Sequence, residues 1–402
     1  MEKLYETAIR PTRVFLIGIR DGRAAQARAE SQDREIKSLI YTLGLEIAGQ
    51  ELVNVRDKQP KYGMGSGKAA EIAEKAAQAP ADCLLFDWEA SPSQQRNWED
   101  LSGIPAIDRQ ELIIRIFADR AATTEAELQV KLAELEYSLP RLSHKYIDLS
   151  RQRGGHYGTR GSGETKLETD RRKVQQQIHR LEKELEVIKK QRQTRRKQRT
   201  RQGMPVCAIV GYTNAGKSSL LNALTGADVL VEDKLFATLD TATRRFDYAP
   251  GSTVLLTDTV GFIRRLPHSL VKAFRSTLEE AALADLLIHV LDAAEPDIDS
   301  FYNTTRTVLA ELGAENIPVI TVLNKADRLE KAVLPSGLPT VDPQLPEDGA
   351  ETARIESLRA RFPGSIFTSV KNGTGLVELK QAIGIALESA LTRHPDELVQ
   401  RK

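Results

Sequence analysis

Short apolar runs alternate with stretches of helical periodicity along the first 120 residues or so. The predicted strands lie at 13–20, 46–55 and 83–87, and the predicted helices lie at 35–43 and 67–77. Ser91-Pro92 predicts one more helix, because serine suits an N-cap and proline suits a first turn. This alternation predicts a small α/β domain.

From Thr124 onwards the apolar spacing becomes that of two long helices. The first seam has leucines four, three and four residues apart, and the second has the same heptad character. Their members are Leu128, Leu132, Leu135 and Leu139, then Leu167, Val174, Ile178, Leu181, Leu185 and Ile188. Pro140 should weaken the first helix near its end. Because each seam needs a partner, we expect an antiparallel helical hairpin.

The segment between the two seams differs in composition. Residues 151–165 contain five glycines and no apolar periodicity. This pattern predicts a mobile loop at the tip of the hairpin.

From Met204 the alternation of strands and helices returns. A strand leads into residue 211, others are predicted at 253–256, 286–291, 318–323 and 366–369, and a last helix at 376–390. The pattern predicts a doubly wound sheet, with a proline-rich surface insertion at 331–350. The chain is therefore an α/β multidomain protein, with expected boundaries at 1–123, 124–203 and 204–392 and a tail at 393–402.

Charge is balanced over the whole chain but not locally. The 57 basic and 56 acidic residues give a net charge of +1, yet residues 189–201 hold eight basic residues and no acidic one. A solvated helix face would usually mix both signs, so the run favours contact with a polyanion, although a plain solvated face stays open.

Cysteine usage and hydropathy limit the cellular setting. Cys83 and Cys207 lie inside apolar strand-like runs and are expected in the core, not in a disulfide. The N-terminus lacks the apolar core of a signal peptide, and no apolar run is long enough for a membrane helix. We expect a soluble, cytoplasmic, monomeric protein with no membrane span.

A phosphate-binding loop follows the strand that begins the third segment. Its residues are Gly211, Tyr212, Thr213, Asn214, Ala215, Gly216, Lys217 and Ser218. The glycines let backbone N–H groups converge on phosphates, Lys217 adds a point charge, and the Ser218 hydroxyl suits Mg²⁺. A similar stretch from Gly63 to Lys68 has the wrong spacing and predicts a turn into a helix, with a second nucleotide contact as the alternative.

Two later motifs indicate guanine recognition. Asn324, Lys325, Ala326 and Asp327 follow an apolar strand. The Asp327 carboxylate can accept hydrogen bonds from the guanine N1–H and amine, which adenine lacks. Ser369, Val370 and Lys371 can complete the base pocket, or they simply end a strand in a turn.

The magnesium and γ-phosphate corner is predicted at Asp258, Thr259, Val260 and Gly261. Phe262 follows, where Ras-like GTPases have the glutamine that orients the attacking water. No residue can therefore be assigned as catalytic. A switch threonine for Mg²⁺ is also needed, and Thr238, Thr241 and Thr243 all qualify by chemistry.

Together these motifs resemble the HflX family of translation-factor-like GTPases. The resemblance rests on the nucleotide motifs, on DTVGFIRRLP from Asp258, and on three further stretches: Phe236-Ala237-Thr238-Leu239-Asp240, RGSGETKLETDR from Arg160, and SPSQQRN from Ser91. It covers residues 13–330 and resumes at the last strand and helix. Two departures are the tip sequence RGSGETKLE, where the family usually has proline and glutamine, and a longer insertion at 331–350.

The resemblance implies a C-terminal P-loop GTPase domain that binds GTP or GDP with Mg²⁺ and acts on the large ribosomal subunit and its RNA. It also implies that Ser218 and Thr238 are the magnesium ligands and that Phe236 to Asp240 belong to the nucleotide site. Low intrinsic turnover, stimulated by the ribosome, is expected. Asn214 suggests K⁺ as an additional charge-neutralising element.

These features favour a GTPase that splits or rescues stalled ribosomes. Two alternatives remain open at this point. One is an assembly GTPase of the large subunit, and the other is an RNA-remodelling NTPase that uses the N-terminal domain.

Overall fold

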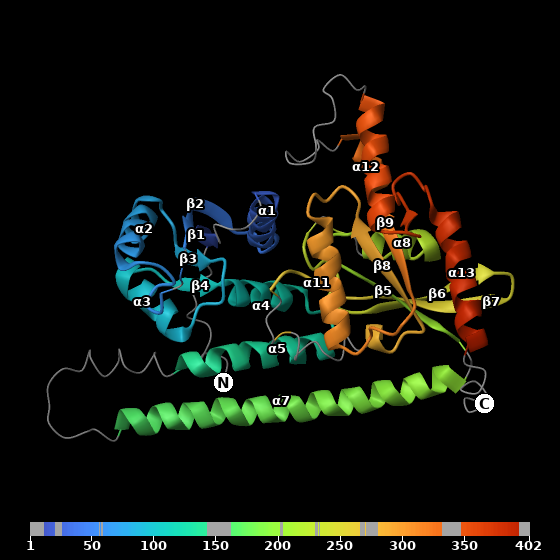
Figure 1. The fold of residues 1–402 in the computed structure, drawn as a ribbon. Coiled ribbons are helices and arrows are strands. Elements are labelled where there is room, and N and C mark those ends of the chain that lie inside the picture. Colours follow the sequence, from blue (N-terminus) through green and yellow to red (C-terminus); the bar gives the residue numbers. More distant parts are fainter. Residues whose placement is uncertain are drawn as a thin grey trace. The chain divides into compact units, whose positions relative to one another are not determined.

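A computed structural model describes residues 12–20, 26–55, 57, 59–142, 162–201, 204–229, 232, 234–265, 270, 280–331 and 347–393. The chain forms two compact units (Figure 1). The N-terminal unit takes its residues from 1–119 and 128–184, and the C-terminal unit takes 120–127 together with 185–402. Both units are mixed α/β, as predicted. The domain boundaries expected from the sequence remain a prediction. The two compact units each contain part of both hairpin helices, so they do not separate a hairpin domain from the rest of the chain.

The N-terminal unit is built on a four-stranded parallel sheet. Its strands are β1 (Arg13–Arg20), β2 (Glu46–Asn54), β3 (Cys83–Phe86) and β4 (Ala106–Asp108), in the order β2-β1-β3-β4. The first three strands confirm the prediction. The fourth was not predicted, because three residues are too few to show a period.

Four helices accompany this sheet: α1 (Gln26–Thr42), α2 (Ser66–Gln78), α3 (Pro92–Ser102) and α4 (Arg109–Arg120). Helix α3 begins as expected, with Ser91 and Gln94 forming a reciprocal capping box. Trp98 of α3 is fully buried beside Phe86, and its indole N–H donates to the carbonyl of Tyr62 at 3.1 Å. Helix α1 begins nine residues before the predicted one, which started at Glu35, and α4 was not predicted.

Two long helices form the hairpin: α5 (Thr124–Ser138) and α7 (Ser162–Arg201), with a 3₁₀ turn η1 (Leu139–Arg141) after α5. Helix α5 ends just before Pro140, as predicted. Arg192 of α7 contacts Glu125 of α5 at 2.9 Å, so the end of one helix lies beside the start of the other and the pair is antiparallel.

The glycine-rich tip begins and ends differently from the prediction. Residues 162–165 were assigned to a mobile loop but form the first turn of α7. One glycine costs a helix only about 1 kcal/mol, so Gly163 does not prevent this first turn. The predicted loop residues 151–161 lie outside the described residues.

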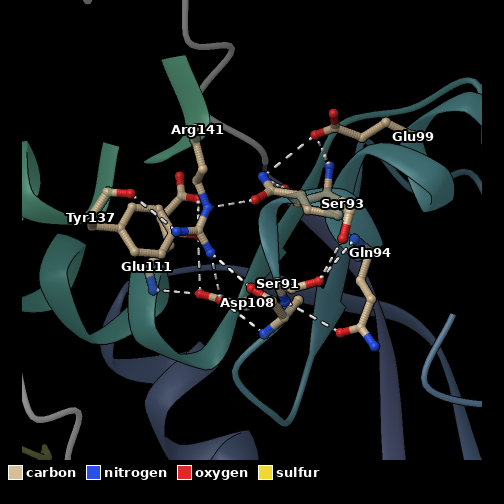
Figure 2. Close-up of polar contacts among 11 residues, drawn as sticks. Ser91, Ser93, Gln94, Glu99, Asp108, Glu111, Tyr137 and Arg141 are labelled. Atoms are coloured by element: carbon tan, nitrogen blue, oxygen red, sulfur yellow. Dashed lines mark hydrogen bonds and ion pairs between the residues drawn. The ribbon is translucent and has the colours of Figure 1, made fainter. Parts of the chain in front are cut away.

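A buried polar network ties the end of α5 to the carboxyl end of β4 (Figure 2). The Asp108 carboxylate accepts hydrogen bonds from Ala90 N at 3.1 Å, Glu111 N at 2.9 Å and the Tyr137 hydroxyl at 3.1 Å. Arg141 contacts the same carboxylate at 3.2 Å and lies over the Tyr137 ring at 3.5 Å. Burial raises the pKa of Asp108 to about 6. The network holds α5 and η1 to the N-terminal sheet.

The C-terminal unit contains a six-stranded sheet in the order β10-β9-β8-β5-β7-β6. Its strands are β5 (Val206–Gly211), β6 (Ala242–Ala249), β7 (Ser252–Asp258), β8 (Leu286–Asp292), β9 (Val319–Asn324) and β10 (Ile366–Phe367). All neighbours are parallel except β6, which pairs antiparallel with β7. The doubly wound sheet is confirmed. Strand β6 was not predicted, because Arg244 and Arg245 are both exposed at the sheet edge and interrupt any alternation.

Helices cover both faces of this sheet. They are α8 (Lys217–Thr225), α11 (Ile298–Glu311), α12 (Glu347–Arg361) and α13 (Leu376–Arg393), with a 3₁₀ segment η2 (Ala326–Lys331). Helices α8 and α13 pack in one apolar cluster, and α11 and α12 pack in two others. Of the predicted insertion, residues 347–350 belong to α12, and 332–346 lie outside the described residues.

Both cysteines are buried and free, as predicted. Burial raises the pKa of Cys83 to about 12 and that of Cys207 higher still, so neither is a reactive thiolate. Within the described ranges, no helix combines the length and hydropathy that a bilayer crossing requires.

Candidate functional site

The predicted motifs meet at the carboxyl edge of the C-terminal sheet. The phosphate loop follows β5, Asp258 ends β7, Asn324 ends β9, and Ser369 comes just after β10. Parallel strands bring the loops at their carboxyl ends to one side, where doubly wound proteins bind ligands. The topology therefore explains why motifs that are up to about 160 residues apart share one site.

Two glycines of the phosphate loop are required by their surroundings. Gly216 has a φ of +93°, and a side chain there would meet the Asn324 amide nitrogen at 2.3 Å. Gly211 has a φ of +148°, and a side chain would meet the carbonyl oxygen of Val290 at 2.2 Å. The loop can only take this course with glycine at both positions.

Lys217 lies at the start of α8 and is buried. Its ammonium group donates to the carbonyl of Tyr212 at 2.9 Å, which folds the side chain back over the loop. Burial lowers the pKa of Lys217 to about 8, although the Asp258 carboxylate partly opposes this effect. An anionic ligand in the loop would favour the charged lysine and raise that pKa.

Three oxygen-bearing side chains converge beside Lys217. The Ser218 hydroxyl lies 2.7 Å from the Thr238 hydroxyl and 2.6 Å from Asp258 Oδ2, and Thr238 lies 3.1 Å from the same carboxylate oxygen. Thr243, in contrast, pairs with Thr257 at 3.0 Å between β6 and β7. The structure thus brings Thr238 to Ser218, while Thr241 has no such contact among the described residues.

Hard oxygen ligands of this kind suit Mg²⁺. Asp258 Oδ1 is buried without a hydrogen-bond partner among the described residues, as is the Thr213 hydroxyl. Burial raises the pKa of Asp258, while Lys217 opposes the rise. A nearby cation would offset the free-energy cost of burying this charged carboxylate, so the residues present fit a magnesium ion.

The residues predicted to recognise the base are held by two separate sets of side-chain hydrogen bonds. The Asn324 amide donates to the carbonyl of Ala215 at 3.0 Å, and the Thr368 hydroxyl donates to Asn324 Oδ1 at 3.1 Å. The Ser369 hydroxyl donates to Asp327 Oδ1 at 2.6 Å. That hydrogen bond lowers the pKa of Asp327 and keeps it a carboxylate. Ser369 therefore orients Asp327, whereas Val370 packs partly against the core and Lys371 is exposed.

Lys325 connects the base motif to the phosphate loop. Its ammonium group donates to the carbonyl of Asn214 at 2.6 Å and pairs with Asp292 at 2.9 Å. Both Asn214 and Lys325 have a positive φ, of 59° and 60°. Such left-handed backbone is uncommon outside glycine and is held here by the surrounding contacts.

Phe262 lies in the core and not in the site. Its side chain is 1% exposed and packs with Ala208, Val210 and Leu287. Its backbone is joined to the phosphate loop, because Phe262 N donates to the Gly211 carbonyl at 3.1 Å and Thr213 N donates to the Phe262 carbonyl at 2.8 Å. The residue in the usual glutamine position is thus a packing residue.

A cavity of about 270 Å³ is lined by the phosphate loop and the switch segment, and the lining of the base motif is limited to Lys325. Its lining includes phosphate-loop residues, Ala237, Thr238 and Gly261, and also three charged residues that the sequence reasoning missed: Glu232, Lys234 and Arg328. Glu232 and Lys234 lie in a stretch without a recognisable motif. Arg328 directly follows Asp327, and only that adjacency could have indicated it.

The stretch from Gly63 to Lys68 forms the predicted turn into a helix. Gly65 is the N-cap of α2, and the Lys68 ammonium group is paired with Glu51 and Glu71, each at 2.8 Å. With its lysine neutralised in this way, the stretch has no free charge for a phosphate.

The fold and the site define a P-loop GTPase. Three family profiles match consecutive parts of the chain: "GTP-binding GTPase N-terminal" at residues 30–118, "GTP-binding GTPase Middle Region" at 120–199 and "50S ribosome-binding GTPase" at 206–325. The chain belongs to the HflX family of GTPases, so it binds and hydrolyses GTP.

Curated relatives of this family match most of the chain. The GTPase HflX of Akkermansia muciniphila is 45% identical over 89% of this chain and 80% of its own length. Those of Escherichia coli and Treponema denticola are 41% and 44% identical over 90% of this chain, and over 80% and 89% of their own lengths. A crystal structure of a GTP-binding protein from Sulfolobus solfataricus in complex with GDP is 23% identical, with a TM-score of 0.45 over 94% of this chain and 99% of that one.

Proposed function

We propose that this GTPase binds the large ribosomal subunit in its GTP state and splits or rescues stalled ribosomes, and that hydrolysis resets it. The proposal is supported by the family profile over residues 206–325, which is described as a 50S ribosome-binding GTPase. The cluster of eight basic residues at 189–201 belongs to the same unit as the nucleotide site. Such a run suits the phosphates of ribosomal RNA.

The residues of the site divide the work of nucleotide binding. Lys217 and the phosphate-loop N–H groups hold the β- and γ-phosphates. Asp327, oriented by Ser369, accepts hydrogen bonds from guanine. Ser218 and Thr238 would ligate Mg²⁺, with Asp258 beside them, and the ion would supply charge neutralisation at the phosphates.

Hydrolysis by this chain alone is slow in our proposal. Phe262 is buried and has no group that could orient water. A partner that completes such a site can raise the rate by about 10³–10⁵. We assign that role to the ribosome, assisted by K⁺ at Asn214, which is exposed at the rim of the cavity. Replacing K⁺ by Na⁺ should lower the hydrolysis rate, and equal rates would remove K⁺ from the proposal.

A density-gradient experiment tests the ribosomal role. Intact ribosomes are incubated with the protein and a non-hydrolysable GTP analogue, and the sedimenting particles are compared with those from a GDP incubation. We expect the protein to convert intact ribosomes to free subunits in the incubation with the analogue and not in the incubation with GDP. Protein bound to large subunits without any loss of intact ribosomes would instead support the assembly role.

Deletion of residues 151–163 tests whether the hairpin tip is needed. GTP binding should be unchanged, because the nucleotide site lies in the other unit. Ribosome-stimulated hydrolysis should weaken and splitting should stop. Full splitting by the deletion variant would show that the ribosome is engaged elsewhere.

A further inference from the structure

The switch segment that carries Thr238 is tethered to a short connecting stretch far away in sequence. Asp240 accepts hydrogen bonds from the backbone N of Ala122 at 3.3 Å and from the Thr123 hydroxyl. At the other end of the segment, Glu232 pairs with Arg120 at 2.7 Å. Residues 121–123 join α4 to α5. Together with Arg120, the last residue of α4, they belong to the same compact unit as the nucleotide site.

The interior of the switch segment is fixed by burial. Phe236 is 2% exposed and Leu239 is 3% exposed. Phe236 also has a φ of 56°, a left-handed conformation that is unusual for a bulky side chain and needs support from its surroundings. The segment is therefore held by apolar contacts in its middle and by polar contacts at both ends.

The tether at Asp240 acts close to the magnesium corner. Only Leu239 separates Asp240 from Thr238, and the Thr238 hydroxyl lies 3.1 Å from Asp258. With Leu239 buried, a displacement of Asp240 must move Thr238 as well. The carboxylate of Asp240 is engaged by residues 122 and 123, which indicates a positioning role and not a ligand role.

The same stretch is also connected to Glu280, which follows the magnesium and γ-phosphate corner in the sequence. Thr123 caps the start of α5 by accepting a hydrogen bond from Ala126 N at 3.2 Å. Arg192 of α7 pairs with Glu125 at 2.9 Å and lies 3.9 Å from Glu280. The base of the hairpin thus contacts both the switch segment that carries Thr238 and Glu280.

We propose that residues 120–123 form a seat, that is, a support that holds the switch segment carrying Thr238 in place. The positioning residues that present Thr238 to the GTP-bound site are Asp240, Thr123, Arg120 and Glu232. The proposal rests on the assignment of Thr238 as the magnesium threonine. Because a switch of this kind engages the nucleotide through the γ-phosphate and Mg²⁺, the seat favours GTP over GDP. It also gives the hairpin helices a direct connection to the nucleotide state.

The test uses the full chain and compares Asp240→Asn with Asp247→Asn. Asp247 lies on β6 and pairs with Thr253 at 2.6 Å, so it is a matched loss of one charge outside the seat. Affinities for fluorescent GTP and GDP analogues are measured with Mg²⁺, and amide hydrogen exchange over residues 232–240 is measured without nucleotide. The set also includes Thr123→Val, the single variant Arg120→Glu, and the double variant that combines Arg120→Glu with Glu232→Arg.

We expect Asp240→Asn and Thr123→Val to weaken GTP binding by about three- to tenfold, the scale of one lost hydrogen bond, with GDP binding unchanged. Exchange over 232–240 should increase in both variants. Arg120→Glu should behave similarly, and adding Glu232→Arg should restore GTP binding. Asp247→Asn should match the parent protein.

Three outcomes would overturn the seat: equal losses of GTP and GDP affinity, no difference between Asp240→Asn and Asp247→Asn, or faster hydrolysis in the variants. A Thr238→Ala variant separates this proposal from the magnesium assignment. If Thr238→Ala leaves Mg²⁺-dependent GTP binding intact, the magnesium assignment is wrong, whatever the tether variants show.

Discussion

Asp327 and Ser369 show how a single hydroxyl prepares a side chain for its ligand. The Ser369 hydrogen bond at 2.6 Å fixes one carboxylate oxygen and lowers the pKa of Asp327. In the proposed site, guanine is recognised through its N1–H and amine, which are donors. Selectivity for guanine is expected to depend on both residues and not on Asp327 alone.

The base preference can be redirected by Asp327→Asn. The amide supplies a donor that suits the 2-oxo group of xanthine and repels the guanine amine. We expect GTP affinity to fall by about two orders of magnitude or more and XTP affinity to rise. Competition binding with GTP, XTP and ATP measures this preference. Ser369→Ala serves as the comparison and should weaken GTP without favouring XTP, and unchanged GTP selectivity in Asp327→Asn would contradict the assignment.

Lys217 should take up a proton when the nucleotide binds. Its pKa of about 8 in the free chain means that half the molecules carry a neutral lysine at pH 8, and the phosphates favour the charged form. GTP affinity should therefore fall by about fourfold between pH 7 and 8.5. Calorimetry at pH 8 in buffers of different ionisation enthalpy should show an uptake of about half a proton. Lys217→Arg stays charged and should abolish the uptake, and an uptake equal to that of the parent would assign the proton to another group.

At this scale the sequence predicted the residues whose motifs are continuous. The phosphate loop, the base motif and Asp258 each lie at the carboxyl end of a strand, so local pattern and topology were sufficient to predict where they meet. The contacts of Arg120 and Thr123 were not predictable, because their partners lie 112 and 117 residues further along the chain. Nothing local distinguishes these residues from any other polar connection.

At the scale of elements, Phe262 lies where the segment after β7 is hydrogen-bonded to the phosphate loop, and this position determines what its backbone and side chain do. The paired backbone hydrogen bonds with Gly211 and Thr213 fix the backbone just after Gly261, and the side chain packs in the apolar cluster. This geometry separates two functions that one residue often combines. The backbone at position 262 is part of the site, while the side chain is part of the core.

Substitutions at Phe262 should therefore change stability and not catalysis. Phe262→Leu should keep basal GTP hydrolysis within a few-fold of the parent. Phe262→Gln should not accelerate it, and the buried amide should cost about 1–3 kcal/mol of unfolding free energy. Single-turnover hydrolysis and chemical denaturation measure the two effects. A rate increase with glutamine would show that this side chain can reach the nucleotide after all.

Element prediction succeeded where periodicity was long and failed where an element was short or exposed. Strands β1, β2 and β3 and both hairpin helices have clear apolar spacing. Strand β4 has three residues, and β6 lies at a sheet edge with exposed arginines, so neither shows a period. The first turn of α7 was missed because its glycine and polar residues are also typical of a loop.

For the molecule as a whole, the two units can be followed separately by fluorescence. The chain has two tryptophans, Trp88 and Trp98, and both are buried in the N-terminal core. Unfolding that is monitored by tryptophan emission therefore reports on the N-terminal unit. Nucleotide binding and hydrolysis report on the C-terminal unit.

This separation allows a test of Asp108. Its pKa is about 6 in the folded chain and 3.8 ordinarily, so the folded state binds more protons between these values. Asp108 therefore stabilises the fold most below about pH 4, and that contribution is lost as the pH rises through 6. Relative to Asp108→Asn, the parent should lose about 2–2.5 kcal/mol between pH 4 and 7. Denaturation monitored by tryptophan emission measures the difference, and parallel pH profiles for the two proteins would contradict the raised pKa.

The division of the hairpin between the two units has a consequence for biosynthesis. Arg120 is translated 112 residues before its partner Glu232. At roughly 5–20 residues per second, Arg120 is made on the order of ten seconds before the switch segment emerges. The N-terminal sheet, complete by residue 108, can fold first and hold its part of the nascent chain. The C-terminal unit must then pack against residues 120–127, which were made long before the rest of that unit. The order of synthesis therefore favours assembly of the nucleotide site onto an existing hairpin base.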